Sequence, residues 1–319
     1  MMSFKNLLGM NSITICLAFA VVVGITGFVT EAATTAYLYS MIELLILTYS
    51  LNIFTGFSGY INFGHVIFYG IGAYVVAILA FNLVATPLPT FVYVLAAGVF
   101  ASLVALAIGF PVLKLRGDYF AIATLGVNEA VRVTIINIKE LGESRGIAIL
   151  GYIPTYDIRS LFAMLLATFF AVLLITNFVY RSRLGYGLRA IKADEDVAEA
   201  MGVNTRNYKI ISYALGAFFA GLAGGIITLL YAYAFPDYFI IGRTVDMLAS
   251  LVLGGIGTML GPLIGSVIYY VVRDALLIQF PFFAQIAFGI ALIVLVLFLP
   301  EGILGIINRL LRKRGKRLD

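Results

Sequence analysis

Long apolar runs separated by short polar stretches fill most of the chain. The runs reach the length of ~20 residues that an α-helix needs to cross a bilayer. Apolar residues are continuous within each run rather than alternating with polar ones, which favours helices and excludes a closed β-barrel. The pattern predicts membrane-spanning helices over residues 11–29, 34–54, 56–83, 90–113, 118–138, 160–180, 209–234 and 279–299.

The basic residues predict which side of the membrane each loop occupies, because loops rich in Lys and Arg stay in the cytoplasm. Lys114 and Arg116 follow the fourth span, and Arg181 and Arg183 follow the sixth. Both landings fit a chain whose N-terminus and C-terminus are cytoplasmic.

The segment 244–276 decides the helix count. The span before it ends outside and the C-terminal tail lies inside, so this segment must enter the membrane and return, turning at residues 254–262. We therefore predict an all-α polytopic membrane protein with roughly ten transmembrane helices. The glycine-rich breaks at 56–72 and 254–265 fall one in each half, which predicts inverted repeats with broken helices.

Composition supports a single transmembrane domain over residues 1–319. The chain is 62% hydrophobic and 12% charged, whereas a soluble domain has roughly 25% charged residues. Much of the net charge of +5 lies in the loop 181–208 and the tail 300–319, which indicates contact with membrane lipids rather than nucleic acid. The one cysteine, Cys16, excludes an internal disulfide.

The loop 181–208 is the one long polar stretch. Three carboxylates at 194–196 mark a helix start, because they satisfy free backbone N–H groups and the positive end of the dipole. Gly202 can end that helix because glycine adopts positive φ. We predict a short helix over 195–201 that carries small residues. It either docks into a groove of another protein or belongs to a solvated loop.

Several polar residues lie inside apolar runs. Glu43 interrupts the second run, and an intramembrane carboxylate points to a function. His65, the only histidine, could bind substrate or protons, or it could hydrogen-bond a backbone carbonyl that the break frees. We expect the structural role, because broken helices need local donors. Asn52, Asn62 and Ser58 admit the same two roles.

Two residue patterns indicate structural roles, and the lack of catalytic and metal-binding motifs argues against an enzyme. Glu129 and Arg132 can pair on one helix face. Gly216, Ala220 and Gly224 form a stripe that lets helices approach closely. The chain has no G-x-x-x-x-G-K-[ST] loop for ATP, no H-E-x-x-H motif and one histidine, so we expect neither an enzyme nor a metal site.

Four motifs resemble the permease subunits of branched-chain amino acid ABC transporters, in the expected order between about residues 51 and 300. The first two are LNIFTGFSGYINFGHVIFYGIGAY and GDYFAIATLGVNEAVR, of which the second is similar to the LivM-type subunit. The third, GYGLRAIKADEDVAEAMGVN, resembles the family's cytoplasmic coupling loop. The fourth, LGGIGTMLGPLIG, resembles its late glycine-rich break.

The resemblance implies a type II ABC importer-like fold and an ATP-driven importer in the cell membrane of a prokaryote. Two separate ATPase subunits, which bind ATP and Mg, would dock on the loop helix within 189–202. A LivH-type permease or a second copy of this chain would complete the pathway. An extracytoplasmic substrate-binding protein would deliver the substrate.

The resemblance also implies candidate site residues. Those for ATPase coupling are Gly187, Arg189, Ala190, Asp194, Glu195, Ala198, Ala200 and Gly202. Those for the pathway and its broken helices are Asn52, Gly56, Gly59, Asn62, Gly64, His65, Gly254, Gly255, Gly257, Thr258, Gly261 and Pro262. We expect no catalytic residue and no cofactor bound by this chain.

One departure from the family leaves the substrate open. The family has a Thr-Gly-Gly-rich stretch after the fifth span, where this chain has ELGESRGI. That stretch would face the outside, near the binding protein, so urea and short amides remain alternatives to branched-chain amino acids. A second alternative is an ion-coupled secondary carrier that uses Glu43 or His65.

Overall fold

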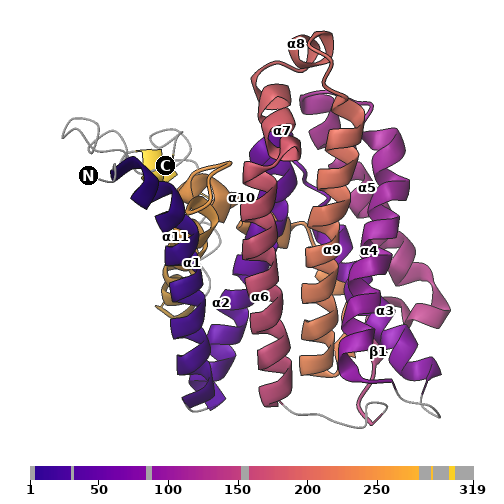
Figure 1. Ribbon diagram of the computed structural model, residues 1–319. Helices are drawn as coiled ribbons and strands as arrows, with labels where there is room; N and C mark the ends of the chain where they lie inside the picture. Colours follow the sequence, from indigo (N-terminus) through magenta and orange to yellow (C-terminus); the bar gives the residue numbers. More distant parts are fainter. Residues whose placement is uncertain are drawn as a thin grey trace.

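The computed structural model describes residues 4–29, 32–83, 88–151, 158–279, 289 and 302–305. Its long helices run side by side as a bundle (Figure 1). The elements are α1 (Phe4–Val29), α2 (Ala32–Leu51), the π-helical turn η1 (Asn52–Gly56), α3 (Val66–Asn82), α4 (Thr90–Val112), α5 (Asp118–Asn137), the 3-10 turns η2 (Lys139–Leu141) and η3 (Glu143–Arg145), β1 (Ile147–Ala148), α6 (Ile158–Arg181), α7 (Arg183–Ala193), α8 (Glu195–Ala200), α9 (Thr205–Tyr231), β2 (Tyr233–Ala234), the 3-10 turn η4 (Pro236–Phe239), α10 (Gly242–Gly254) and α11 (Gly261–Gln279).

Within the described residues, six helices are long and apolar enough to cross a membrane: α1, α2 with η1, α4, α5, α6 and α9. Each overlaps a span predicted from the sequence, which confirms a mostly helical, multi-pass architecture. α3 occupies the third predicted span but is shorter. The predicted span 279–299 and the tail 300–319 lie almost entirely outside the described residues, so the count of ten helices and the inverted repeats stay predictions.

α9 lies between α6 and the α3–α4 pair and is mostly buried (Figure 1). The small-residue stripe explains how closely its neighbours approach. A Cβ atom at Gly72 of α3 would lie 2.1 Å from the carbonyl oxygen of Gly221, and one at Gly224 would lie 1.9 Å from that of Tyr69. α3 and α9 therefore pack backbone to backbone, which confirms the packing role of the stripe.

α10 and α11 form an antiparallel pair. Asp246 of α10 meets Tyr269 and Arg273 of α11, while Ser250, one turn further along α10, lies beside Gly265. The chain reverses between the two helices at residues 255–260. The predicted reversal around 254–262 is therefore confirmed.

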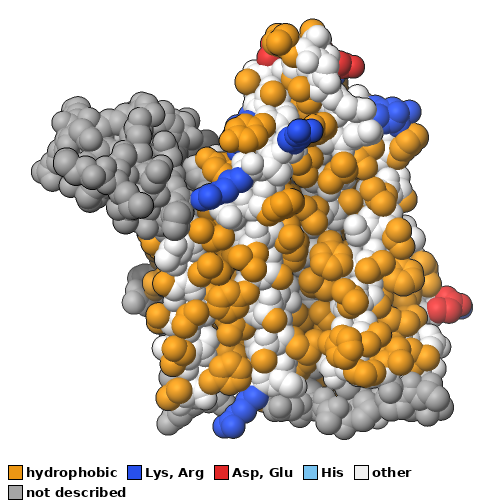
Figure 2. Space-filling model, in the orientation of Figure 1, with side chains coloured by type: hydrophobic (Ala, Val, Ile, Leu, Met, Phe, Trp, Pro, Cys, Tyr) orange, Lys and Arg blue, Asp and Glu red, His pale blue; other side chains and the backbone are white. Residues whose placement is uncertain are grey.

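The bundle has two different ends. α7 and α8 lie at one end, which we call the α8 end, and β1 lies near the other, which we call the β1 end (Figure 1). At the β1 end Ile147 pairs with Ala234 of β2. Hydrophobic side chains cover most of the visible flank, whereas basic and acidic side chains occur around α8 (Figure 2). An apolar flank with a polar cap suits a bundle that crosses a bilayer.

Candidate functional site

The first predicted break separates α2 from α3. α2 continues through η1 as far as Ser58, and the chain then extends over 59–62 before α3 begins at Val66. Gly59 is exposed and has a φ of 79°. The other residues assigned to this break are buried: Asn52, Gly56, Asn62, Gly64 and His65.

The second break lies directly against the first. The residues assigned to it are the end of α10, the turn and the start of α11: Gly254, Gly255, Gly257, Thr258, Gly261 and Pro262. Asn52 Nδ2 donates to the carbonyl oxygen of Thr258 at 3.1 Å, and its Oδ1 accepts from the amide of Gly257 at 3.0 Å. We call this contact the break junction (Asn52, Gly56, Gly257 and Thr258). It unites two breaks that are 205 residues apart in sequence.

His65 has a different partner from the one predicted. Its Nε2 lies 2.8 Å from the hydroxyl oxygen of Ser50 rather than from a freed carbonyl. Ser50 donates to the carbonyl oxygen of Leu47 at 2.7 Å, so the imidazole nitrogen is the donor in the first bond. His65 is buried and ties the start of α3 to the end of α2. This arrangement suits the structural role.

The sequence identified Glu43 but not its partner. Arg243 donates from Nη1 to Glu43 Oε1 at 2.6 Å, and the hydroxyl of Tyr69 donates to the same oxygen at 2.6 Å. A search for a basic residue within the other apolar segments would have found Arg243, because an intramembrane carboxylate needs an opposite charge. The predicted pair of Glu129 and Arg132 is confirmed on α5 at 2.5 Å.

The predicted loop helix is confirmed as α8. Asp194 caps it, because its Oδ1 accepts from the amides of Asp196 and Val197, each at 3.0 Å. Gly202 ends it with a φ of 87° and donates its amide to the carbonyl oxygen of Glu199 at 2.9 Å. Local signals in the sequence therefore fix both ends of this helix.

Of the two alanines assigned to coupling on α8, Ala200 is exposed but Ala198 is not. Ala198 is only 4% exposed, so it packs inward and cannot present its side chain to a partner. Val197, Ala200 and Met201 are exposed, and Met201 reaches 81%. The orientation of so short a helix depends on tertiary packing, which its sequence does not encode. The exposed small and apolar side chains of this segment are therefore those of Val197, Ala200 and Met201.

Other residues assigned to coupling hold the loop together. A Cβ atom at Gly187 would lie 2.4 Å from the ring of Tyr208, so this position packs against α9. Arg189 donates to the carbonyl oxygen of Tyr180 at 2.9 Å and lies over the ring of that residue. Ala190 is half-buried on α7. These three positions shape the loop from inside.

Glu195 anchors α8 to the bundle. It accepts a hydrogen bond from Lys209 Nζ of α9 at 2.6 Å and another from the hydroxyl of Tyr60 in the first break. Burial raises the pKa of Glu195, but the hydrogen bonds from Lys209 and Tyr60 lower it by more than burial raises it. The pKa of Glu195 therefore lies below its usual value. The carboxylate therefore stays ionised and holds three segments together.

Arg116, just after α4, clamps the outer side of α8. It forms ion pairs with Asp196, with Glu199 at 3.3 Å and with Glu195 at 4.0 Å. The hydrogen bond to Asp196 raises the pKa of Arg116 above its usual value. Surface pairs contribute little singly, so the importance of this cluster is that it gives α8 one position relative to α4.

Lys192 of α7 reaches the break junction. Its Nζ donates to the carbonyl oxygen of Gly56 at 3.0 Å. A Cβ atom at Gly257 would lie 3.2 Å from the same nitrogen. Burial lowers the pKa of Lys192 below its usual value. The loop 181–208 therefore contacts the first break through Glu195 and both breaks through Lys192.

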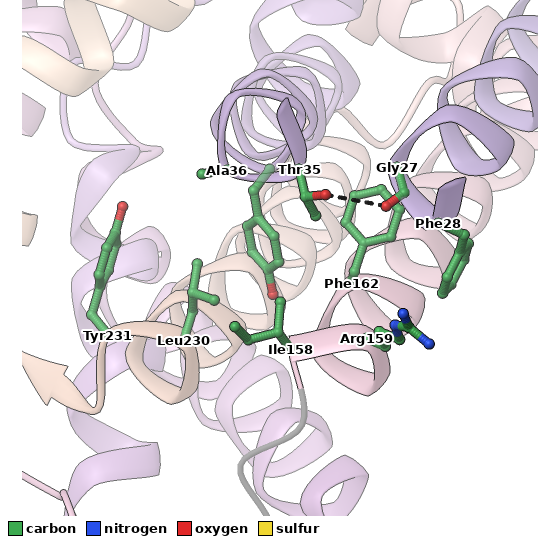
Figure 3. Close-up of a pocket in the computed structure, with 10 residues that line it drawn as sticks. Gly27, Phe28, Thr35, Ala36, Ile158, Arg159, Phe162, Leu230 and Tyr231 are labelled. Atoms are coloured by element: carbon green, nitrogen blue, oxygen red, sulfur yellow. Dashed lines mark hydrogen bonds between the residues drawn. The ribbon is translucent and has the colours of Figure 1, made fainter. Parts of the chain in front are cut away.

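A cavity opens among α1, α2, α6 and α9 towards the β1 end (Figure 3). Its volume is about 420 Å³. Phe28 and Phe162 supply aromatic surface, Thr35 donates to the carbonyl oxygen of Gly27 at 3.3 Å, and Arg159 lies at its side (Figure 3). The residues that line it include no carboxylate. Its described lining can hold apolar groups but offers no counter-charge for an ammonium group.

Comparison with known proteins agrees with these features. Residues 33–299 match the model of a family described as the permease component of branched-chain amino acid transport systems. LivM of Escherichia coli (strain K12), a high-affinity branched-chain amino acid transport permease, is 28% identical over 86% of this chain and 69% of its own length. No solved structure matches the chain.

The second permease type of the same transport systems is similar as well. LivH of Escherichia coli (strain K12) is 29% identical over 78% of this chain and 87% of its own length. BraD of Pseudomonas aeruginosa is 32% identical over 43% of this chain and 45% of its own length. The family model covers most of the chain, including both breaks and the loop 181–208, and the chain therefore belongs to the branched-chain amino acid transport permease family.

Proposed function

We propose that this chain is the LivM-type permease subunit of an ATP-driven importer for branched-chain amino acids. Two ATPase subunits, which carry ATP and Mg, dock on α8, and the α8 end and both chain termini are cytoplasmic. A LivH-type permease or a second copy of this chain completes the pathway. An extracytoplasmic binding protein delivers substrate at the β1 end. The membrane is the cell membrane of a prokaryote.

One observation carries this proposal: the loop 181–208 combines an exposed helix face with bonds to the first break and a position beside the second. Val197, Ala200 and Met201 lie exposed on α8. Behind them, Lys192 and Glu195 bond to the first break, and the ammonium group of Lys192 lies beside Gly257 of the second. A partner that moves α8 would therefore move the breaks, where the helices are already interrupted. A solvated loop without function needs neither feature.

The mechanism follows from this connection. ATP binding draws the two ATPase subunits together, and the docked α8 moves with them. Because Arg116, Lys209 and Lys192 hold the loop to α4, α9 and the break junction, the loop moves as one body. A rigid loop that acts on interrupted helices can switch the pathway between two access states.

The ion-coupled carrier is less well supported. His65 is buried and its imidazole is occupied by Ser50, while Glu43 is held by Arg243 and Tyr69. A coupling site must exchange protons or ions with water on alternating sides. The structural roles suffice to explain both residues.

The test is reconstitution with and without the partners. In proteoliposomes, we expect leucine uptake only when the ATPases, the second permease, the binding protein and ATP are all present. A non-hydrolysable ATP analogue should abolish it. Uptake by this chain alone, driven by a pH gradient, would contradict the proposal.

Docking on α8 has its own test. Ala200→Trp adds bulk to the exposed face and should prevent copurification of the ATPases, whereas Ala130→Trp, on the exposed surface of α5, should not. If the Ala200→Trp chain keeps its ATPases and a normal uptake rate, α8 is not the docking element.

A further inference from the structure

A second pocket lies between α2, α10 and α11, and it is lined by charges of both signs. Its volume is about 200 Å³. The lining includes the carboxylates of Glu43 and Asp246 and the guanidinium groups of Arg243 and Arg273. Leu44 and Leu47 of α2 supply an apolar wall beside them. We call it the charged pocket.

The two ion pairs of the charged pocket differ in tightness. Arg243 and Glu43 are 2.6 Å apart, and Tyr69 completes that pair. Arg273 Nη2 lies 3.6 Å from Asp246 Oδ2, beyond normal hydrogen-bond distance. The side chains of Arg273 and Asp246 are 43% and 23% exposed, respectively. Asp246 Oδ1 accepts a hydrogen bond from the hydroxyl of Tyr269, so only Oδ2 faces Arg273. The first pair is therefore a closed structural unit, whereas Asp246 Oδ2 and the guanidinium group of Arg273 have capacity for a further partner.

The position of these charges calls for a function. Glu43 lies near the middle of α2, so its partner Arg243 lies at the same depth in the bundle. Ionisable groups at such a depth are costly, and those on spanning segments typically face substrate or ion pathways. Tyr231, at the end of α9, lines both the charged pocket and the cavity at the β1 end. The two pockets thus lie next to one another on a route from that end.

We propose that the charged pocket is a substrate site for an apolar amino acid in its zwitterionic form. Asp246 receives the α-ammonium group and Arg273 the α-carboxylate, so the zwitterion inserts into the loose ion pair. The aliphatic side chain lies against Leu44 and Leu47. The tight pair of Glu43 and Arg243 forms the adjoining wall and keeps the two helices in register. The pocket volume suits one amino acid of this size.

This inference rests on the proposed function and narrows its substrate class. Urea and short amides are neutral, so they gain little from a carboxylate and a guanidinium buried together, and the desolvation of those charges would be uncompensated. A zwitterion loses its own hydration on entering the membrane and needs both signs of charge. The apolar wall then favours an aliphatic side chain over a polar one.

The test is protection from thiol labelling in the complete transporter. Ser40→Cys places a thiol at the charged pocket, and the native Cys16 is fully buried. Leucine at millimolar concentration should slow labelling of position 40. Leucinamide lacks the carboxylate, 4-methylpentanoate lacks the ammonium group, and 4-methylpentanamide lacks both charges; none of the three should protect at that concentration.

Variants identify the contacts. Asp246→Asn and Arg273→Gln should each raise the leucine concentration for half-protection by roughly tenfold or more, since a hydrogen bond to a charged group is lost. Arg273→Lys keeps the positive charge, so its leucine concentration for half-protection should lie between those of wild type and Arg273→Gln. The matched control is Glu129→Gln, which breaks an ion pair on the exposed face of α5 and should change nothing.

The outcomes separate this inference from the proposed function, because labelling needs no ATP. Equal protection by 4-methylpentanamide would overturn the zwitterion site, and so would unchanged protection in both Asp246→Asn and Arg273→Gln. Either result could occur while uptake remains ATP-dependent. The proposed permease function would then still hold, but the charged pocket would not be the substrate site. Uptake that is independent of ATP and of the ATPases would overturn the function without affecting the protection result.

Discussion

The loop 181–208 and the break junction are both polar regions, but they are built in different ways. In the loop, the helix α8 is defined by neighbours in sequence: Asp194 caps it and Gly202 ends it. In the break junction, Asn52 bonds to residues more than 200 positions away. The helix of the loop can therefore form from local signals, whereas the junction exists only in the assembled bundle. Variants that remove contacts within the bundle should therefore affect stability more than variants of the loop.

The largest effect on stability is expected where a charge loses its partner. Arg243→Gln leaves the buried carboxylate of Glu43 unpaired, which destabilises a protein by about 3–5 kcal/mol. Glu43→Gln should be milder, because its amide oxygen can still accept from Tyr69 and Arg243, and ATP-driven uptake should survive. Thermal unfolding in detergent measures the stability of both variants, and uptake per assembled complex measures their transport activity. Loss of uptake in a well-assembled Glu43→Gln complex would instead support a coupling role.

The next effect concerns the break junction. Asn52→Leu removes the partners of the Gly257 amide and the Thr258 carbonyl, which we expect to cost about 2–3 kcal/mol. Asn137→Leu on α5 is the control, because its side chain bonds only to the carbonyl of Val133 in the same helix. If both variants unfold at the same temperature, the two breaks do not depend on Asn52.

A smaller effect is expected at the end of α8. Gly202→Val forces a β-branched residue into positive φ, at roughly 1–2 kcal/mol. Because a Cβ atom at this position meets nothing within 4 Å, the strain is conformational and not steric. Limited proteolysis of the loop should become faster while the unfolding temperature of the bundle stays nearly unchanged. A large drop in that temperature would show that the loop is not an independent unit.

The smallest expected effect is a pH dependence of the stability of the loop, measured by its proteolysis. The pKa of Glu195 is lower in the folded chain than its usual 4.5, so its ionisation stabilises the fold fully above pH 4.5. That contribution disappears as the pH falls below 4.5 through the folded value. Proteolysis of the loop should therefore accelerate in this acid range, and less so in Glu195→Gln. Equal acceleration in the two chains would remove Glu195 as the cause.

The sequence could predict features that depend on neighbouring residues. Apolar run length identifies the spans, and caps identify α8, because both signals lie within the element itself. It could not predict that Ala198 faces inward, since the orientation of a six-residue helix follows from its contacts with the bundle. It also missed Arg243 as the partner of Glu43 and the bond from Asn52 to Gly257, because periodicity identifies buried faces but not which residues meet there.

The central claim is that the loop transmits the movement of docked ATPases to the breaks. Its most direct test is the number of ATP molecules hydrolysed per leucine imported by Lys192→Met, which removes the bond to Gly56 while leaving the exposed face of α8 intact. Lys114→Met, at an exposed lysine of the same end, is the control. We predict that the Lys192→Met complex keeps its ATPases and hydrolyses ATP but imports less leucine per ATP, whereas the control is normal. A wild-type ratio in Lys192→Met would contradict the account.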